Sequence, residues 1–240
     1  MWEITLLGNA SDIVYYLELK NTLKRNFGND VLAVITFEKA LVISIAVLNK
    51  AKIAKAKNLV MQTIIRIVKV EYMQNNLKCF CNDKSLNSFL LSNIITLDMK
   101  DEVKYALQVA KLSSIVNIRS FVLFKLHNFI DLWEREIAYL NAQFSSREDD
   151  KYLDLLKFIA NNNSSKWDIL YLETTKDQMF LLDKKRNTLK AVCIDDEVGI
   201  IANLVMFAPK KLIINCSHLL SDKVSNLIAY IFEDKISVLL

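Results

Sequence analysis

The chain has 240 residues, of which 52% are hydrophobic and 24% charged, a composition that excludes an intrinsically disordered protein. Its 31 basic and 27 acidic residues leave a net charge of +4, which permits an anionic partner without requiring one. It has only three glycines and two histidines, all isolated, which excludes glycine-rich phosphate loops and familiar zinc spacings, so we predict no cofactor and no metal.

The N-terminal region, residues 1–48, mixes strand and helix patterns. Ser11 or Asp12 can cap a helix, and a turn at Gly28 can end it. Two β-branched runs that follow the turn are split by Glu38 and Lys39, which predicts a hairpin. The predicted elements are a strand at 2–7, a helix from 11 or 12 to about 27, and hairpin strands at 31–37 and 41–48.

The central region, residues 50–163, has helical periodicity throughout. Asp98 and Asp101 have the spacing of a capping box at the start of a helix that ends near Leu112. An apolar stripe with steps of three and four runs from Ile118 to Phe144 and predicts one long amphipathic helix. The other predicted helices are 50 to about 72, with apolar residues at 53, 56, 60, 64 and 67, and 151–160.

The C-terminal region, residues 166–240, returns to strand patterns after a polar linker at 161–165. Asp195, Asp196 and Glu197 open a helix that ends before Pro209, and Ser221 with Asp222 caps the last helix. We predict the order βββαβαβ and an α+β protein made of the regions 1–48, 50–163 and 166–240. The predicted strands are 167–171, 178–182, 188–194, 212–215 and 236–240, and the helices are 195–208 and the one capped at 221–222.

The start of the sequence lacks a basic segment followed by an apolar stretch, so we expect no secretion signal. The longest apolar run, residues 40–48, is much shorter than the roughly 20 residues that cross a bilayer. The four cysteines are then expected to be reduced thiols. These features predict a cytoplasmic protein without a membrane partner.

Four segments between about residue 110 and residue 240 resemble the sporulation protein YtxC family. The sequence Asn-Ile-Arg-Ser-Phe-Val-Leu-Phe-Lys-Leu at 117–126 is similar to the family's aromatic-x-x-Phe-Arg-Leu helix. The sequence departs from the family at Lys125, where an arginine is expected, and it stops at Leu240, before the family's short Cys-containing tail. The other three similar segments are Lys-Tyr-Leu-Asp-Leu-Leu-Lys-Phe at 151–158, Ala-Pro-Lys-Lys-Leu-Ile-Ile at 208–214, and residues 224–238.

The resemblance implies a cytosolic protein of an endospore-forming bacterium, and it implies no reaction and no catalytic residue. Our leading hypothesis is therefore a non-enzymatic sporulation-associated protein that acts through contact with a protein partner or with itself. Apolar residues outside the main stripe of the long helix, Phe121, Phe124 and Leu132, favour a second packing surface such as a dimer contact.

Two alternatives remain open. The first is binding of nucleic acid or another acidic partner through a basic helix, although aromatic residues and a recognisable motif are missing there. Its residues are Lys50, Lys52, Lys55, Lys57, Arg66 and Lys69. The second is a small-ligand site or an enzyme at the end of a buried strand, where α/β sheets bind ligands. Its residues are Asn215, Cys216, Ser217 and His218.

Three further features have a structural interpretation that we prefer. The pair Cys79 and Cys81 has a shorter spacing than a metal-binding or redox pair and lacks a second pair. The acidic residues 195–197 are favoured at the start of a helix by its dipole, more than as ligands of magnesium. His127 lies beside the apolar stripe and is expected to be an exposed or satisfied side chain.

Overall fold

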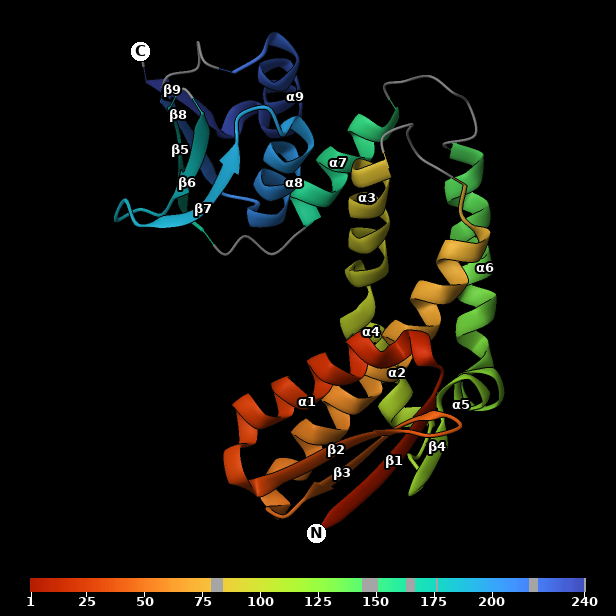
Figure 1. Cartoon of the computed structure of the whole chain (residues 1–240). Helices are drawn as coiled ribbons and strands as arrows, with labels where there is room; N and C mark the ends of the chain where they lie inside the picture. The colour runs from red at the N-terminus through yellow and green to blue at the C-terminus, as the bar shows by residue number, and fades with distance from the viewer. Residues whose placement is uncertain (79–83, 144–150, 163–166, 176, 216–219, 240) are drawn as a thin grey trace. The chain divides into compact units, whose positions relative to one another are not determined.

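The structure is a computed structural model that describes residues 1–78, 84–143, 151–162, 167–175, 177–215 and 220–239 (Figure 1). It divides into two compact units. Unit 1 comprises residues 1–77 and 95–143, and unit 2 comprises residues 78–94 and 144–240. The helix α3 (Lys84–Leu97) contains one of the boundaries between them.

Unit 1 contains a mixed sheet with the strand order β2-β3-β1-β4. The hairpin strands pair antiparallel, β1 pairs antiparallel with β3, and β1 pairs parallel with β4. Buried residues alternate along β3, so one side of this strand packs against the helices. The strands are β1 (Trp2–Gly8), β2 (Val31–Phe37), β3 (Leu41–Val47) and β4 (Ile115–Asn117).

The helices of unit 1 cover one face of this sheet. In α1 the buried residues Tyr16, Leu19, Leu23 and Phe27 recur at steps of three and four, so they form one apolar stripe. Gly28 follows α1 with a φ of 59°, a value that glycine adopts without strain. The helices are α1 (Ile13–Phe27), α2 (Ile53–Asn76), α4 (Met99–Val109), α5 (Ile118–Lys125) and α6 (His127–Gln143), with short 3₁₀ segments at Ala10–Asp12, Gly28–Asp30 and Lys50–Lys52.

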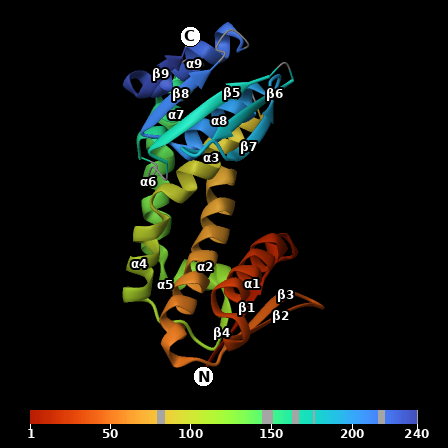
Figure 2. The ribbon, with the colours of Figure 1, turned by 90° about the vertical axis from the view of Figure 1, so that its left-hand side faces the viewer.

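Unit 2 contains a second mixed sheet, with the order β7-β6-β5-β8-β9. Strands β5, β8 and β9 are parallel to one another, whereas β6 and β7 extend the sheet antiparallel. In Figure 2 the strands β5 and β6 pass in front of α8, because this view faces the side of the sheet opposite to the helices. The strands are β5 (Ile169–Thr174), β6 (Gln178–Leu182), β7 (Thr188–Cys193), β8 (Lys211–Asn215) and β9 (Ile236–Leu239).

The helices of unit 2 pack against one another on the buried side of the second sheet. Leu170, Leu172, Leu212 and Ile214 point from neighbouring parallel strands into this core. Ser221 caps α9, its Oγ accepting a hydrogen bond from the amide of Val224. The helices are α7 (Lys151–Asn162), α8 (Glu197–Phe207) and α9 (Asp222–Phe232), with a 3₁₀ segment at Glu233–Lys235.

The α+β class is confirmed, and so is the order βββαβαβ in the C-terminal region. The compact units nevertheless follow a different division from the predicted regions 1–48, 50–163 and 166–240, because residues of the central region belong to both units. Part of the central region completes the N-terminal sheet and its helical cover, whereas α7 packs with α8 and α9.

Three local predictions in the central region were wrong. Residues 115–117 form a strand, because their backbone pairs with β1. The single helix from Ile118 to Phe144 is divided into α5 and α6 at Leu126, whose φ of −127° and ψ of 30° leave the helical region. Asp98 precedes α4, but its side chain makes no capping hydrogen bond.

Candidate functional site

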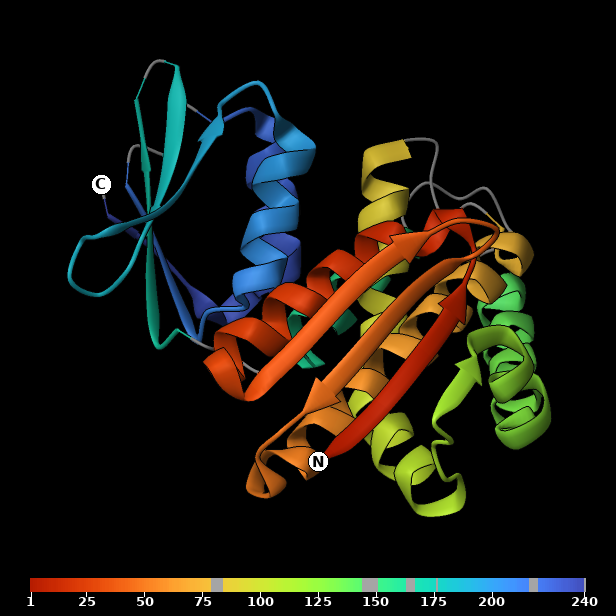
Figure 3. The ribbon, with the colours of Figure 1, turned by 60° about the horizontal axis from the view of Figure 1, so that its bottom comes forward.

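The sheet of unit 1 has one face that none of the described helices of unit 1 covers (Figure 3). The strand registers place its side chains in three rows across the sheet. This surface, called the open face below, contains a single charged residue, Glu3. Its rows are Leu32, Ala46 and Glu3; Val34, Ser44, Thr5 and Ile115; and Thr36, Val42, Leu7 and Asn117.

The apolar residues of the open face are accessible to solvent. The exposed fraction is 64% for Leu32, 45% for Val34 and 63% for Ile115. A solvated antiparallel sheet normally alternates apolar residues toward the core with polar residues toward water. In β2 both sides are apolar, so the strand departs from that pattern. Exposed apolar surface of this kind is typical of a protein contact site.

The same strand forms one edge of the sheet. Its sequence from Val31 to Phe37 contains neither a charged residue nor a proline. Natural edge strands are usually protected from pairing with another chain by charges, prolines or bulges. Strand β2 lacks the first two protections, and its pairing with β3 runs without a register shift. Its backbone is therefore available for pairing with a further strand.

A half-buried ion pair lies next to the ends of the parallel strands β1 and β4. The guanidinium of Arg119 donates to both carboxylate oxygens of Asp12, at 2.8 and 3.0 Å, and its Nε donates to Glu71 at 2.9 Å. The backbone amide of Asn9 also donates to Asp12. Burial, and secondly the charge of Asp12, raise the pKa of the nearby Tyr16 phenol.

Arg119 also lines a groove between α2, α5 and α6 with a volume of about 400 Å³. This volume is in the range of small-molecule sites. The groove combines apolar side chains such as Val68, Leu123 and Ile130 with the polar Asn75 and Ser120. Because two carboxylates already bind the guanidinium, the groove offers no uncompensated positive charge to an anion.

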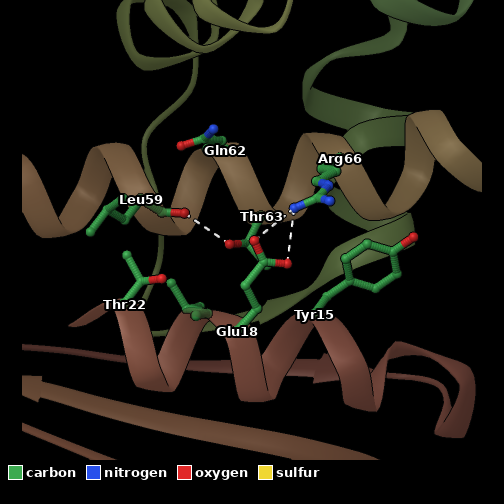
Figure 4. A pocket seen from close by; sticks show the side chains of 8 residues that line it. Tyr15, Glu18, Thr22, Leu59, Gln62, Thr63 and Arg66 are labelled. Atoms are coloured by element: carbon green, nitrogen blue, oxygen red, sulfur yellow. Dashed lines mark hydrogen bonds and ion pairs between the residues drawn. The ribbon is translucent and has the colours of Figure 1, made fainter. Parts of the chain in front are cut away.

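A smaller cavity of about 180 Å³ lies between α1 and α2 (Figure 4). The guanidinium of Arg66 contacts both carboxylate oxygens of Glu18 across it and lies over the ring of Tyr15. Thr63 beside them donates its hydroxyl proton to the carbonyl of Leu59. Arg66, which the sequence suggested for nucleic-acid binding, is thus part of the contact between two helices.

The other predicted basic residues do not form one phosphate-binding surface. Lys52 binds Asp30, Lys55 donates to Asn26, and Lys57 lies over the ring of Trp2. Lys50 is exposed. Lys69 has no exposed surface, so it cannot contact a nucleic acid in this structure.

Lys69 instead belongs to a buried cluster formed by α2, α4 and α6. Its ammonium lies 2.8 Å from Oε1 of Glu102, which also accepts a hydrogen bond from the indole of Trp133 at 2.7 Å. Oε2 of Glu102 is buried and has no hydrogen-bond partner among the described residues. Glu136 lies 4.0 Å from the ammonium, and burial raises the pKa of its carboxyl group.

Of the predicted ligand site, only Asn215 lies within the described residues; Cys216, Ser217 and His218 do not. Asn215 ends β8, and its Nδ2 donates to Glu173 of β5 at 3.0 Å. Glu173 also pairs with Arg186, whose guanidinium lies over the ring of Tyr171. The buried Oδ1 of Asn215 has no partner among the described residues.

Two of the three acidic residues at the start of α8, Asp196 and Glu197, make structural contacts. Asp196 caps the helix by accepting from the amide of Gly199, and Glu197 accepts from Ser221 and Lys223. These hydrogen bonds lower the pKa of Glu197. His127 begins α6 with an exposed side chain. The pair Cys79 and Cys81 lies outside the described residues.

No protein-family model, curated protein or solved structure matches the chain. The resemblance to the YtxC family therefore stays a prediction. Among the described helices, none is long and apolar enough to cross a membrane. The described residues also contain no group of three or more histidine, cysteine or acidic side chains that could hold a metal ion.

Proposed function

We propose that this protein is a docking module that binds protein through the open face of its N-terminal sheet. The observation that carries the proposal is the combination of exposed apolar side chains with a single charged residue on that face. Burying one such aliphatic side chain completely stabilises a complex by about 1.5 kcal/mol or more. Leu32, Val34 and Ile115 lie in two adjacent rows of one continuous surface, so one partner can cover them together.

The ion pairs of unit 1 support a role in binding better than a role in catalysis. The Asp12–Arg119 pair, whose carboxylate is buried, and the buried Lys69–Glu102 pair join elements distant in sequence, and their charges hold these elements together. In the described part of the chain, the best-formed polar clusters thus stabilise the unit that presents the open face.

The proposal is tested by incorporating a photoreactive phenylalanine analogue at Val34 or Ile115 in the native host. Each position should give a discrete crosslinked protein species after irradiation. The same analogue at Lys24, an exposed residue of α1 away from the open face, is the matched control. Equal labelling patterns at Val34 and Lys24 would contradict docking at the open face.

We further propose that this docking serves endospore formation in the cytoplasm. The support is the resemblance of residues 117–126 and 208–214 to the YtxC family. A strain without the gene should form fewer heat-resistant spores, and a gene encoding a variant with Val34→Glu and Ile115→Glu should fail to restore them. Normal sporulation of the deletion strain would count against this role.

A second candidate function is binding of a small ligand in unit 2. The buried Oδ1 of Asn215, which has no partner among the residues that the structure describes, favours it, because this atom lies at the carboxyl end of a parallel strand and a ligand with a hydrogen-bond donor would satisfy it. Ligand-observed NMR with a library of small amides and amines tests this function. Binding that Asn215→Leu abolishes would support it, and an absence of binders would remove it.

A further inference from the structure

The edge strand β2 is self-complementary. Leu32 and Val34 are two positions apart, so both lie on the open face. If a second copy of β2 pairs antiparallel about a two-fold axis at Ala33, Leu32 of each copy lies opposite Val34 of the other. Leu32 and Val34 are the exposed apolar residues of β2 on the open face. The two-fold axis gives two equivalent contacts between them, one on each side of the axis.

Charge also favours this register. With the axis at Ala33, Asp30 lies opposite the neutral Thr36, and no like charges face each other. Moving the axis by one residue to Val34 would place Asp30 opposite Glu38, and directly opposed like charges are destabilising. Asp30 already has a cationic partner, Lys52 at 2.7 Å, and needs none from a second chain.

We propose that two copies of this chain associate by antiparallel pairing of β2 about Ala33, which joins their four-stranded sheets into one continuous sheet. The occupant of the free edge is thus a second copy of the chain. The proposal rests on the function proposed above, because it names one partner for the same surface. Pairing leaves the rest of the open face, including Ile115 at the other edge, free for a further protein.

Sedimentation of the purified full chain tests the pairing. The wild-type chain should sediment as a dimer, and Val34→Lys should raise the dissociation constant about a hundredfold, since it removes both symmetry-related Leu32–Val34 contacts and each is worth about tenfold. Ile115→Lys is the matched control, because it places the same charge on the same face but at the opposite edge. It should leave the dimer intact. Circular dichroism verifies that each variant is folded.

A monomeric wild-type chain would overturn the pairing. Loss of the dimer in Ile115→Lys with retention in Val34→Lys would also overturn it, because that result indicates contact between sheet faces instead of edges. Either outcome leaves the docking function testable on its own. A monomeric chain that still crosslinks to a different protein through Val34 would retain the docking function while excluding self-pairing.

The register is tested in a chain whose four native cysteines are replaced by serine. A mixture of Leu32→Cys and Val34→Cys chains should crosslink with a short thiol reagent faster than either chain alone, since directly opposite Cβ atoms are about 5 Å apart and diagonal ones about 7 Å. Fastest crosslinking of Val34→Cys with itself would overturn the axis at Ala33.

Discussion

Asp12 and Arg119 form a bidentate ion pair although 107 residues separate them in the sequence. Asp12 follows β1 and Arg119 follows β4, and these two strands are parallel neighbours. The pair therefore joins the N-terminal strand to a strand that the sequence pattern did not reveal. With an exposed fraction of 2%, Asp12 depends on Arg119 for compensation of its charge.

We expect Arg119→Ala to lower the free energy of unfolding by about 3 kcal/mol, because it leaves the carboxylate of Asp12 buried without its cation. The matched variant Glu71→Gln removes the exposed partner of the same guanidinium and should cost less than about 1 kcal/mol. Urea denaturation followed by circular dichroism measures both. Equal losses of unfolding free energy in the two variants would contradict the claim that the burial of Asp12 makes its ion pair the more important one.

Gly8 is required by the same ion pair. A Cβ at this position would lie 2.5 Å from Oδ2 of Asp12 and 2.7 Å from the hydroxyl of Tyr16. We expect Gly8→Ala to destabilise the protein by about 2 kcal/mol, as overpacking does in other cores. In an Asp12→Ala background the added cost should be smaller, because one of the clashing groups is gone. Strict additivity in this double-mutant cycle would exclude the clash with Asp12.

The buried pair of Lys69 and Glu102 should show strong coupling. Lys69→Met leaves the carboxylate of Glu102 buried near Trp133 without a cation and should lower stability by about 3 kcal/mol or more. Adding Glu102→Gln removes that charge but keeps an acceptor for the indole, so the double variant should be more stable than Lys69→Met alone. Denaturation midpoints decide this, and a double variant less stable than Lys69→Met would refute the pairing.

Glu197 should contribute to the acid sensitivity of unit 2. Its folded-state pKa is lowered by hydrogen bonds from Ser221 and Lys223, so its contribution to stability is present above the unfolded pKa of about 4.3 and is lost as the pH falls through the folded value. We expect Glu197→Gln to cost less than about 1 kcal/mol at pH 7, because the side chain is partly exposed, and we expect this cost to shrink as the pH falls below the unfolded pKa. Stability measured as a function of pH tests the sign. A cost that grows toward pH 3 would contradict it.

Local sequence patterns predicted most of the secondary structure for a physical reason. The hairpin of β2 and β3 and α9 of unit 2 are specified by local signals: a turn, a capping residue or a hydrophobic period within a few residues of the element. Strand β4 was missed because its three residues are too few to show a period, and pairing with β1 stabilises them. The break at Leu126 was missed because that buried residue keeps the apolar stripe in phase.

The candidate site was less predictable than the fold. A sequence signal for the open face did exist, since β2 is apolar at both odd and even positions, but only the strand order shows that this strand is an edge. The pairing of Asp12 with Arg119 has no local signal at all. Lys69 had the pattern of a surface lysine, and its burial follows from the packing of α2 with α4 and α6.

The most direct test of docking is carbene footprinting of the open face, with the chain labelled once in its native cells and once in isolation at high dilution. We predict that labelling of Leu32, Val34 and Ile115 falls several-fold in cells, while labelling of exposed apolar residues elsewhere in unit 1, such as Val14 of α1, stays the same. Equal labelling of the three residues in both states would mean that nothing covers the open face in cells, and docking at this face would be excluded.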